Sequence, residues 1–287
     1  MPPTIWIDGQ YRDGASATVS VYDHGLLYGD GVFEGIRAYK RRVFRLQQHL
    51  DRLYASAKGI WLEIPIAKEA MGRLVEEAVR KSGHEDAYIR LVVTRGAGDL
   101  GLDPRKCPKP SIILIVDEIH LWPADRYDNG LTALTAATPI GHRESLSPRI
   151  KSLNYLAHIL AKVEGIAAGV DEVLMLDPGG YVAEASGMNL FAVVNGTIKT
   201  PPAYIGILKG ITRDAVIELA RDANYAVEEV PLNRYDLYTA DEVFLTGTAA
   251  EIVGVSKLDA RTIGKGVPGP VTRDLSKRFK ALVTQRD

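Results

Sequence analysis

Lys151 is the residue of this sequence whose position points most directly to chemistry. It lies in SLSPRIKSLNYLAHILAKVEG, between a turn marked by Pro148 and an apolar run with helical periodicity. An amine forms a Schiff base only when part of it is neutral, and burial or a nearby cation such as Arg149 lowers a lysine pKa toward that state. The pattern therefore allows a Schiff-base lysine, and it equally allows a solvated lysine in front of a helix.

Other stretches would suit an anionic cofactor that carries an aldehyde. In GITRDA, Ile211 and Thr212 lie at an expected helix start, where free N–H groups and the positive end of the dipole favour a phosphate. TGTAAE, residues 246–251, offers a second such cup with the Thr248 hydroxyl. Arg52 could add a charge-assisted contact to the same phosphate. Each of these also has an ordinary interpretation as a capped helix or a solvated face.

A pyridine cofactor also needs an acid opposite its ring nitrogen, because a carboxylate that holds this proton turns the ring into an electron sink. Glu184, in YVAEASGMNLF between two strand-like segments, is the candidate for this acid. The same residue could instead be an exposed glutamate at the end of a strand.

Several other chemistries fit the sequence poorly. GAGDLG, residues 96–101, matches a dinucleotide fingerprint, but that motif must open a helix, and LDPRKCPKP follows it with three prolines. A nicotinamide-dependent oxidoreductase stays as the alternative from another enzyme class. Neither a G-x-S-x-G elbow nor an S-x-x-K pattern ends on Lys151, which argues against a serine hydrolase. The six histidines lack zinc-ligand spacing, so no metal is expected.

Length, charge and cysteine content set the general class. A chain of 287 residues should form two domains or one large one. A formal charge of −1 gives no bulk attraction to nucleic acid or membrane. With Cys107 as its single cysteine, and with no segment that resembles a signal peptide or a membrane span, the chain is expected to be cytoplasmic.

The first half of the chain predicts a small α+β domain, residues 1–119. Hairpins are expected around Asp8-Gly9 and near Lys40-Arg41. Helical periodicity covers residues 46–60 and 67–83, and apolar strand-like runs cover residues 87–95 and 111–119. The polar segment 120–130 is interpreted as the interdomain loop.

The second half, residues 131–287, predicts a larger mixed α/β domain that binds the cofactor. Strands are expected at the start, on both sides of an Asn195-Gly196 hairpin and in the stretch 241–260. A helical stripe runs through GITRDAVIELARDANY, residues 210–225.

Six motifs, in their order and spacing, resemble the class IV pyridoxal-phosphate aminotransferases of fold type IV. They are YGDGVFEGIRAY, HLDRLYASAK, IKSLNYL, AEASGMNLF, KGITRDA and EVFLTGTAAEI. Among these enzymes, FEGIRAY and AYIR are most similar to branched-chain amino acid aminotransferases. The resemblance spans nearly the entire chain. It implies transfer of the amino group of L-leucine, L-isoleucine or L-valine to 2-oxoglutarate, in branched-chain amino acid biosynthesis.

The resemblance also implies roles for individual residues around the cofactor. Lys151 would carry pyridoxal 5'-phosphate as a Schiff base and would move the proton between the substrate Cα and the cofactor. Glu184 would hold the proton on the ring nitrogen, and Tyr155 would donate to the ring oxygen. The phosphate would be bound by Arg52, Ile211, Thr212 and Thr248.

On the substrate side, the resemblance implies a carboxylate site, a pocket and a second subunit. The α-carboxylate would lie near Tyr88 and the backbone of Thr248 and Ala249. Arg90 would accept the distal carboxylate of glutamate. Tyr28 and Phe33 would line the side-chain pocket, with Tyr28 serving the neighbouring subunit, so a homodimer or a higher homo-oligomer is expected.

Two departures from the family pattern leave alternatives of the same fold open. Met188 replaces a polar residue of many branched-chain enzymes, and IKSLNYL is one residue shorter than in some relatives. D-amino acid and (R)-amine transaminases share the lysine and the cofactor contacts, and an aminodeoxychorismate lyase would use the same lysine. FEGIR and the Tyr88-Ile89-Arg90 segment favour the L-branched-chain assignment.

Overall fold

The chain divides into two compact units that interleave along the sequence. The structure, a computed structural model, describes residues 2–119 and 121–284. One unit is formed by residues 1–119 with 150–154, and the other by residues 120–149 with 155–287. Residues 150–154, which the sequence assigns to the C-terminal domain, therefore return to the first unit and bring Lys151 with them. The segment 120–130, expected as a loop, contains the short helix α4 (Ala124–Asn129), and residue 120 lies outside the described residues.

The first unit is built on a six-stranded sheet in the order β2-β1-β6-β5-β3-β4, with every neighbouring pair antiparallel. Its strands are β1 (Thr4–Ile7), β2 (Gln10–Arg12), β3 (Gly31–Tyr39), β4 (Arg42–Val43), β5 (Ala87–Thr94) and β6 (Ser111–Asp117). Its helices are α1 (His24–Tyr28), α2 (Leu46–Gly59) and α3 (Lys68–Ser82), with short 3-10 turns η1 (Gly14–Ser16) and η2 (Pro104–Lys106).

Both hairpins predicted in this unit are present, and the same geometry explains them. Asp8 and Gly9 have φ values of 46° and 99°, and Lys40 and Arg41 have 48° and 65°. Two consecutive residues in the left-handed region form the turn whose twist matches that of the two strands it joins. The two predicted helices are also confirmed as α2 and α3, and α3 ends at Gly83 in a left-handed conformation.

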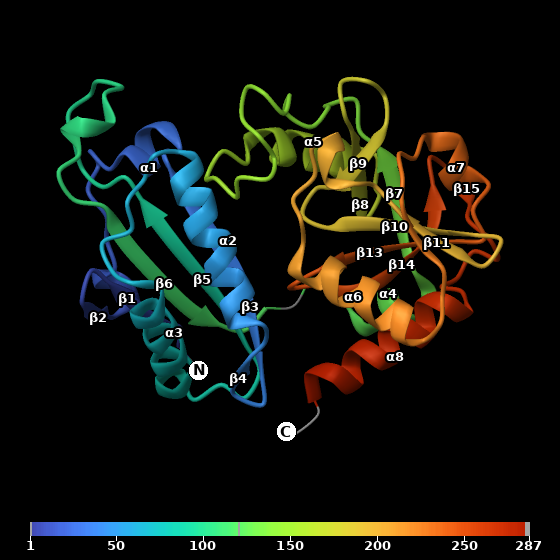
Figure 1. The fold of residues 1–287 in the computed structure, drawn as a ribbon, viewed down its shortest axis with the longest axis horizontal. Coiled ribbons are helices and arrows are strands. Elements are labelled where there is room, and N and C mark those ends of the chain that lie inside the picture. The colour runs from blue at the N-terminus through green and yellow to red at the C-terminus, as the bar shows by residue number, and fades with distance from the viewer. Residues whose placement is uncertain (1, 120, 285–287) are drawn as a thin grey trace. The chain divides into compact units, whose positions relative to one another are not determined.

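Strand β3 separates two environments because successive side chains point to opposite faces of the sheet. Val32, Ile36 and Ala38 belong to the apolar core between the sheet and helices α2 and α3. The side chain of Glu34 lies on the same face of β3. Phe33 and Gly35 lie on the other face. Figure 1 shows α2 and α3 crossing the same side of this sheet.

The second unit is a mixed α/β structure around a nine-stranded sheet, with the main order β12-β11-β10-β13-β14-β7-β8-β9 and β15 paired to β14. Three of the described pairs are parallel and the others antiparallel. The strands are β7 (Leu131–Thr135), β8 (Glu172–Leu176), β9 (Val182–Ala185), β10 (Asn189–Val194), β11 (Thr197–Thr200), β12 (Val227–Glu229), β13 (Glu242–Gly247), β14 (Glu251–Leu258) and β15 (Arg261–Thr262).

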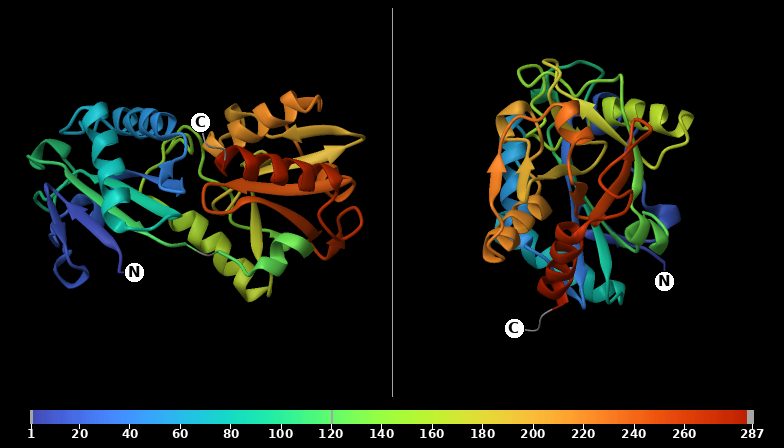
Figure 2. Two further views of the ribbon diagram at one scale, coloured as in Figure 1. Left: turned by 90° about the horizontal axis from the view of Figure 1, so that it is seen from below. Right: turned by 90° about the vertical axis from the view of Figure 1, so that its right-hand side faces the viewer.

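The remaining helices of this unit are α5 (Leu156–Ala167), α6 (Ile211–Asp222), α7 (Arg234–Tyr238) and α8 (Pro270–Thr284), with one 3-10 turn η3 (Ala203–Ile205). Helices α6 and α8 lie side by side against β13, which Figure 2 shows for the orange and red segments. The predicted fold class, a smaller α+β part and a larger mixed α/β part, is therefore confirmed. Among the described residues, no helix combines the length and the apolar character needed to cross a membrane.

Candidate active site

Lys151 is held by its main chain against strand β3 and helix α2. Its carbonyl oxygen accepts a hydrogen bond of 2.9 Å from the N–H of Phe33, and its own N–H donates to Ser56 Oγ at 3.1 Å. Its side chain is half-buried, and Nζ lies 4.5 Å from the centroid of the Phe33 ring. Helix α5 begins only at Leu156, so Lys151 is not a solvated residue at the head of that helix. The segment that carries it is joined to β3 by an isolated antiparallel bridge between Ser152 and Val32.

Arg52 is engaged by a fully buried carboxylate that the sequence interpretation had not noted. Glu34 is 0% exposed, and its two oxygens accept hydrogen bonds of 2.7 Å from Arg52 Nε and Nη2. The side chain of Arg52 is only 13% exposed, which excludes the interpretation of a solvated face. Glu34 Oε2 also lies 2.8 Å from Nδ1 of His49. Arg52 and His49 reach the same carboxylate because they are three residues apart on α2.

The charges of this group are set by burial and by the contacts within it. Burial alone would raise the pKa of Glu34, but the guanidinium of Arg52 and the hydrogen bonds from Arg52 and His49 lower it to about 2. Burial lowers the pKa of His49 more than Glu34 raises it. At neutral pH, therefore, Glu34 is ionised, Arg52 is a cation, and His49 is a neutral imidazole that donates its Nδ1 proton to Glu34.

The other face of this sheet carries three of the predicted substrate residues, Phe33 on β3 and Tyr88 and Arg90 on the neighbouring strand β5. The guanidinium of Arg90 lies 4.6 Å from the Phe33 ring centroid and 5.5 Å from that of Tyr88. Tyr88 is packed over Gly35, where a Cβ atom would overlap the tyrosine hydroxyl. Burial raises the pKa of Tyr88, so the phenol stays protonated and can donate a hydrogen bond. This surface combines apolar rings with one cation, which suits an amino acid with an apolar side chain or a dicarboxylate.

Tyr28 lies on α1 and is 38% exposed. Its hydroxyl donates a hydrogen bond of 2.6 Å to the carbonyl oxygen of Leu100, in the GAGDLG loop, and its ring meets His24 edge to face at 5.0 Å. Both of these contacts are made with residues other than the predicted pocket residue Phe33. The exposed part of Tyr28 is compatible with its predicted contribution to the site of a neighbouring subunit.

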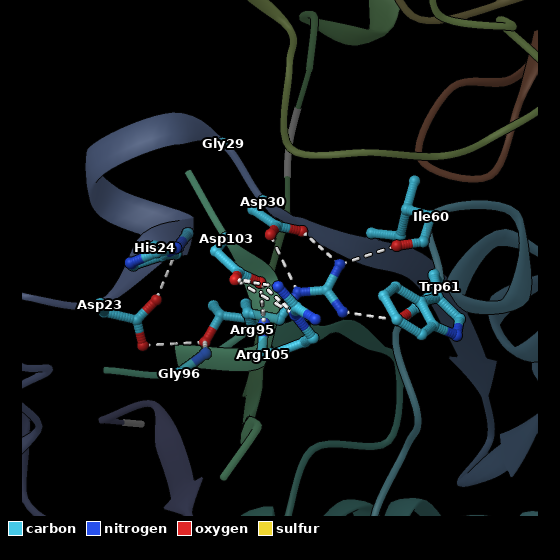
Figure 3. Close-up of polar contacts among 12 residues, drawn as sticks. Asp23, His24, Gly29, Asp30, Ile60, Trp61, Arg95, Gly96, Asp103 and Arg105 are labelled. Carbon is cyan, nitrogen blue, oxygen red and sulfur yellow. Dashed lines mark hydrogen bonds and ion pairs between the residues drawn. The ribbon is translucent and has the colours of Figure 1, made fainter. Parts of the chain in front are cut away.

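The start of the GAGDLG loop is anchored by a buried arginine (Figure 3). Arg95 forms a two-bond fork with Asp30, with both bonds at 2.9 Å, and donates to the carbonyl oxygens of Ile60 and Trp61 at 2.7 and 2.6 Å. The only helical turn that follows among the described residues of this loop is η2, which starts at Pro104. The described residues of this segment therefore contain no dinucleotide-binding helix, and GAGDLG forms a loop after β5.

In the second unit, Glu184 is a buried residue of β9, with 5% exposure, and not an exposed strand end. Its Oε2 accepts hydrogen bonds from the N–H of Leu208 at 3.0 Å and from Asn189 Nδ2 at 3.3 Å. Asn189 Nδ2 also donates to the Leu208 carbonyl oxygen at 2.8 Å. The carboxylate is therefore held in one orientation by the first residue of β10 and by the chain that leads to α6.

The start of α6 lies beside this carboxylate. Ile211 and Thr212 are its first residues, both are buried, and the N-cap residue Gly210 has no side chain that could satisfy their N–H groups. A Cβ atom on Gly210 would overlap the amide oxygen of Asn189, so the helix start and the Glu184 network are in direct contact. The two predicted phosphate donors at this helix start, Ile211 and Thr212, thus lie near the predicted acid of the ring nitrogen.

Thr248 and Ala249 lie in the turn between β13 and β14, and the strand register connects this turn to the same area. Thr246 is paired with Asn189, so the two side chains lie on one face of the sheet. The Thr246 hydroxyl is buried and is one of few buried polar atoms that lack a hydrogen-bond partner among the described residues. A buried hydroxyl in this position is available to a polar ligand.

Tyr155 is connected to the surroundings of Glu184 through His158. It is the N-cap residue of α5, and its ring stacks on His158 with centroids 4.6 Å apart. His158 Nδ1 lies 3.0 Å from the carbonyl oxygen of Ser186, two residues after Glu184. The second unit therefore gathers all of its predicted site residues around one end of its sheet: Tyr155, Glu184, Ile211, Thr212, Thr248 and Ala249.

Sequence interpretation missed Glu34, His49, Gly35 and Asn189. For Glu34 a signal exists, because it is the one charged residue among the alternating positions 32, 34, 36 and 38 of VFEGIRA, and His49 and Arg52 share one face of the predicted helix. Gly35 and Asn189 matter only through residues that are remote in the sequence. Within the described residues, no group of three or more His, Cys, Asp or Glu side chains is arranged to hold a metal ion.

Comparison with known proteins gives one consistent family. The profile of the family described as amino-transferase class IV matches residues 31–258. A putative branched-chain-amino-acid aminotransferase of Methanocaldococcus jannaschii is 52% identical over 98% of this chain and 96% of its own length. The branched-chain-amino-acid aminotransferase of Pseudomonas aeruginosa is 38% identical over 98% of this chain and 92% of its own.

Solved structures agree with these relatives. The branched-chain amino acid aminotransferase of Escherichia coli has a TM-score of 0.95 at 34% identity, covering 98% of this chain and 94% of its own. The branched-chain amino acid aminotransferase of Thermobaculum terrenum, in its holo form with PLP, has a TM-score of 0.89 at 32% identity, covering 100% and 95%.

Proposed function

Because this chain belongs to the class IV aminotransferases, we propose that it transfers the amino group of L-leucine, L-isoleucine and L-valine to 2-oxoglutarate. Its cofactor is pyridoxal 5'-phosphate, as in the rest of this family. The observation that carries the proposal is the half-buried Lys151 amine beside Phe33, on a unit that also presents Tyr88 and Arg90. The names of the relatives support the branched-chain substrates.

The residues of the second unit fit this cofactor. A pyridine nitrogen needs a fixed carboxylate, and Glu184 is buried and oriented by Leu208 and Asn189. A phosphate needs donors, and the start of α6 provides the N–H groups of Ile211 and Thr212 without a capping side chain. The buried Thr246 hydroxyl, which has no partner among the described residues, is a further polar group for a ligand.

In the proposed mechanism, Lys151 has two tasks. Its Nζ would hold the cofactor covalently, and once free it would act as the acid–base group that moves the proton at the substrate Cα. The bound cofactor supplies the electron sink that makes this Cα–H bond acidic. Main-chain bonds to Phe33 and Ser56 keep the origin of the lysine side chain fixed while its amine moves.

The other predicted residues bind and orient. Glu184 keeps the proton on the ring nitrogen, and Tyr155 donates to the ring oxygen. Arg52 balances phosphate charge, together with the donors Ile211, Thr212 and Thr248. Tyr88 and the backbone of Thr248 and Ala249 hold the α-carboxylate, Arg90 accepts the distal carboxylate of glutamate, and Phe33 and Tyr28 line the side-chain pocket. Geometry supports this most strongly for Arg90, whose guanidinium is already fixed between two aromatic rings.

We also propose that the enzyme is at least a homodimer. Helix α5 turns an apolar stripe to the outside at the spacing of one helix face: Leu156, Ile159, Leu160, Val163 and Ile166. Its polar residues Lys162 and Glu164 instead contact their own unit, at the Asp171 carbonyl oxygen and at Thr138. An exposed apolar face of this size indicates a protein surface that becomes covered. The exposed Tyr28 is compatible with a contribution to the site of a second subunit.

We propose a cytoplasmic location, with which the single cysteine, Cys107, is compatible because it can form no internal disulfide.

The substrate assignment is tested by half-reactions on the purified holoenzyme. The enzyme is mixed separately with L-leucine, D-alanine and (R)-1-phenylethylamine, and the visible absorbance of the cofactor is followed. We expect L-leucine to convert the cofactor and 2-oxoglutarate to restore it. Conversion by D-alanine alone, or by the (R)-amine alone, would overturn the L-branched-chain assignment in favour of a related transaminase.

A further inference from the structure

We propose that Glu34 and His49 are positioning residues that aim the guanidinium of Arg52 at the cofactor phosphate. This inference rests on the proposed function and deepens it. Glu34 and His49 lie outside the set of site residues expected from the sequence, and Glu34 forms a buried ion pair with Arg52.

Glu34 binds Arg52 through both of its carboxylate oxygens. Oε1 accepts from Arg52 Nε and Oε2 from Arg52 Nη2, each at 2.7 Å, which is a side-on fork. Two parallel bonds fix both the position and the plane of a guanidinium, whereas a single bond would leave it free to turn. The end of the guanidinium formed by the two Nη atoms is therefore oriented by Glu34.

His49 is the second donor to Glu34. Because burial keeps the imidazole neutral, its Nδ1–H donates to Glu34 Oε2 without adding a second cation beside Arg52. Glu34 Oε2 thus accepts one bond from a charged and one from a neutral donor. This arrangement holds the carboxylate without a second positive charge from His49, so the group formed by Glu34, His49 and Arg52 has one negative and one positive charge.

Helix α2 carries Arg52 and His49 on the same face as a residue that contacts Lys151. His49, Arg52 and Ser56 occur at intervals of three and four residues and so share one face of the helix. Ser56 Oγ accepts the hydrogen bond from the N–H of Lys151 at 3.1 Å. One rigid helix therefore sets the spacing between the proposed phosphate anchor and the lysine that holds the other end of the cofactor. Positioning by rigid elements is what a reacting group of this kind requires.

A merely structural ion pair would look similar, so the test must separate the two roles. The apoprotein is titrated with pyridoxal 5'-phosphate and, separately, with pyridoxal, which lacks the phosphate. The variants are Glu34→Gln and His49→Asn. Asp30→Asn is the matched control, because it breaks the fork between Asp30 and Arg95, which has the same geometry in the same unit but belongs to no proposed cofactor contact.

We expect Glu34→Gln to weaken pyridoxal 5'-phosphate binding roughly ten- to a hundred-fold, the usual range for a charged hydrogen bond, and to leave pyridoxal binding unchanged. His49→Asn should also weaken the binding of pyridoxal 5'-phosphate and not that of pyridoxal, by a smaller factor. This variant tests the inference if Glu34→Gln does not fold. In an Arg52→Lys background, the additional effect of either change should disappear, because the fork no longer exists.

Asp30→Asn should not change the ratio of the two affinities. Equal losses for the two ligands in Glu34→Gln and His49→Asn, or no loss for either, would overturn the inference while leaving the proposed function intact. If the unaltered protein binds neither ligand, the proposed function itself fails, and the inference fails with it.

Discussion

The main chains of Phe33 and Lys151 are joined by a hydrogen bond of 2.9 Å from the N–H of Phe33 to the carbonyl oxygen of Lys151. The same two residues meet through their side chains, with Nζ 4.5 Å from the centroid of the ring. The amine proposed to react with the substrate is therefore attached to the strand that carries Phe33, one of the proposed pocket residues.

The first prediction concerns Arg52→Ala. Removal of Arg52 leaves the carboxylate of Glu34 buried without its cation, and breaking a buried pair in this way typically costs about 3–5 kcal/mol of unfolding free energy. The variant should therefore lose stability in denaturant titration as well as cofactor affinity. Arg52→Lys, which retains the charge but not the fork, should be less unstable. A stability for Arg52→Ala equal to that of the unaltered protein would contradict the burial of this pair.

The second prediction concerns acid. The pKa of Glu34 is lowered to about 2 in the folded chain, from the ordinary value of 4.5 that it regains on unfolding. The pair's contribution to stability is therefore complete above pH about 4.5 and is lost as the pH falls from there toward about 2, where the unfolded chain binds the proton more strongly. The unfolding free energy, measured between pH 3 and 7, should fall less steeply with acid in Glu34→Gln. Identical slopes would contradict this.

The third prediction concerns Gly35→Ala. The added Cβ atom would overlap the hydroxyl of Tyr88, so the tyrosine must move away from the proposed carboxylate site. Overpacking of this kind costs about 1–3 kcal/mol of stability, and KM for the amino acid should rise. Gly14→Ala is the control, because a Cβ atom there meets no neighbour within 4 Å. An unchanged KM for leucine in Gly35→Ala would argue against the role of Tyr88.

The fourth prediction concerns α5. Replacing Ile159 and Val163 by lysine places two charges in the exposed apolar stripe, which a dimer interface would have to bury. Light scattering should show a smaller molar mass than for the unaltered protein. Val267→Lys, a comparable change on an exposed apolar residue outside α5, should leave the mass unchanged. A double variant that keeps its mass would show that α5 is not the interface.

Local sequence patterns predicted the elements well because their causes are local. Asp8-Gly9 and Asn195-Gly196 form turns through their own backbone preferences, and the apolar spacing around Leu50 and Leu53 is sufficient to indicate α2. The resemblance of the motifs, and not their local physics, supplied most of the roles proposed for single residues.

Long-range contacts could not be predicted in this way. The attachment of residues 150–154 to β3 joins segments far apart in the sequence, and no periodic pattern encodes it. The partner of Arg52 was missed for the same reason, because the burial of Glu34 depends on the packing of α2 over the sheet. A charged residue in a strand is ordinarily taken as exposed until its partner is known.

The decisive measurement is the location of the covalent attachment of the cofactor. The holoenzyme is reduced with borohydride, digested and analysed by mass spectrometry, in parallel with Lys151→Ala. We predict that the phosphopyridoxyl mass is found on the peptide that contains Lys151. The variant should lose both this label and transamination. Its fold should change little, because Lys151 is anchored through its main chain. Labelling of another lysine, or near-normal turnover by Lys151→Ala, would contradict the assignment of Lys151.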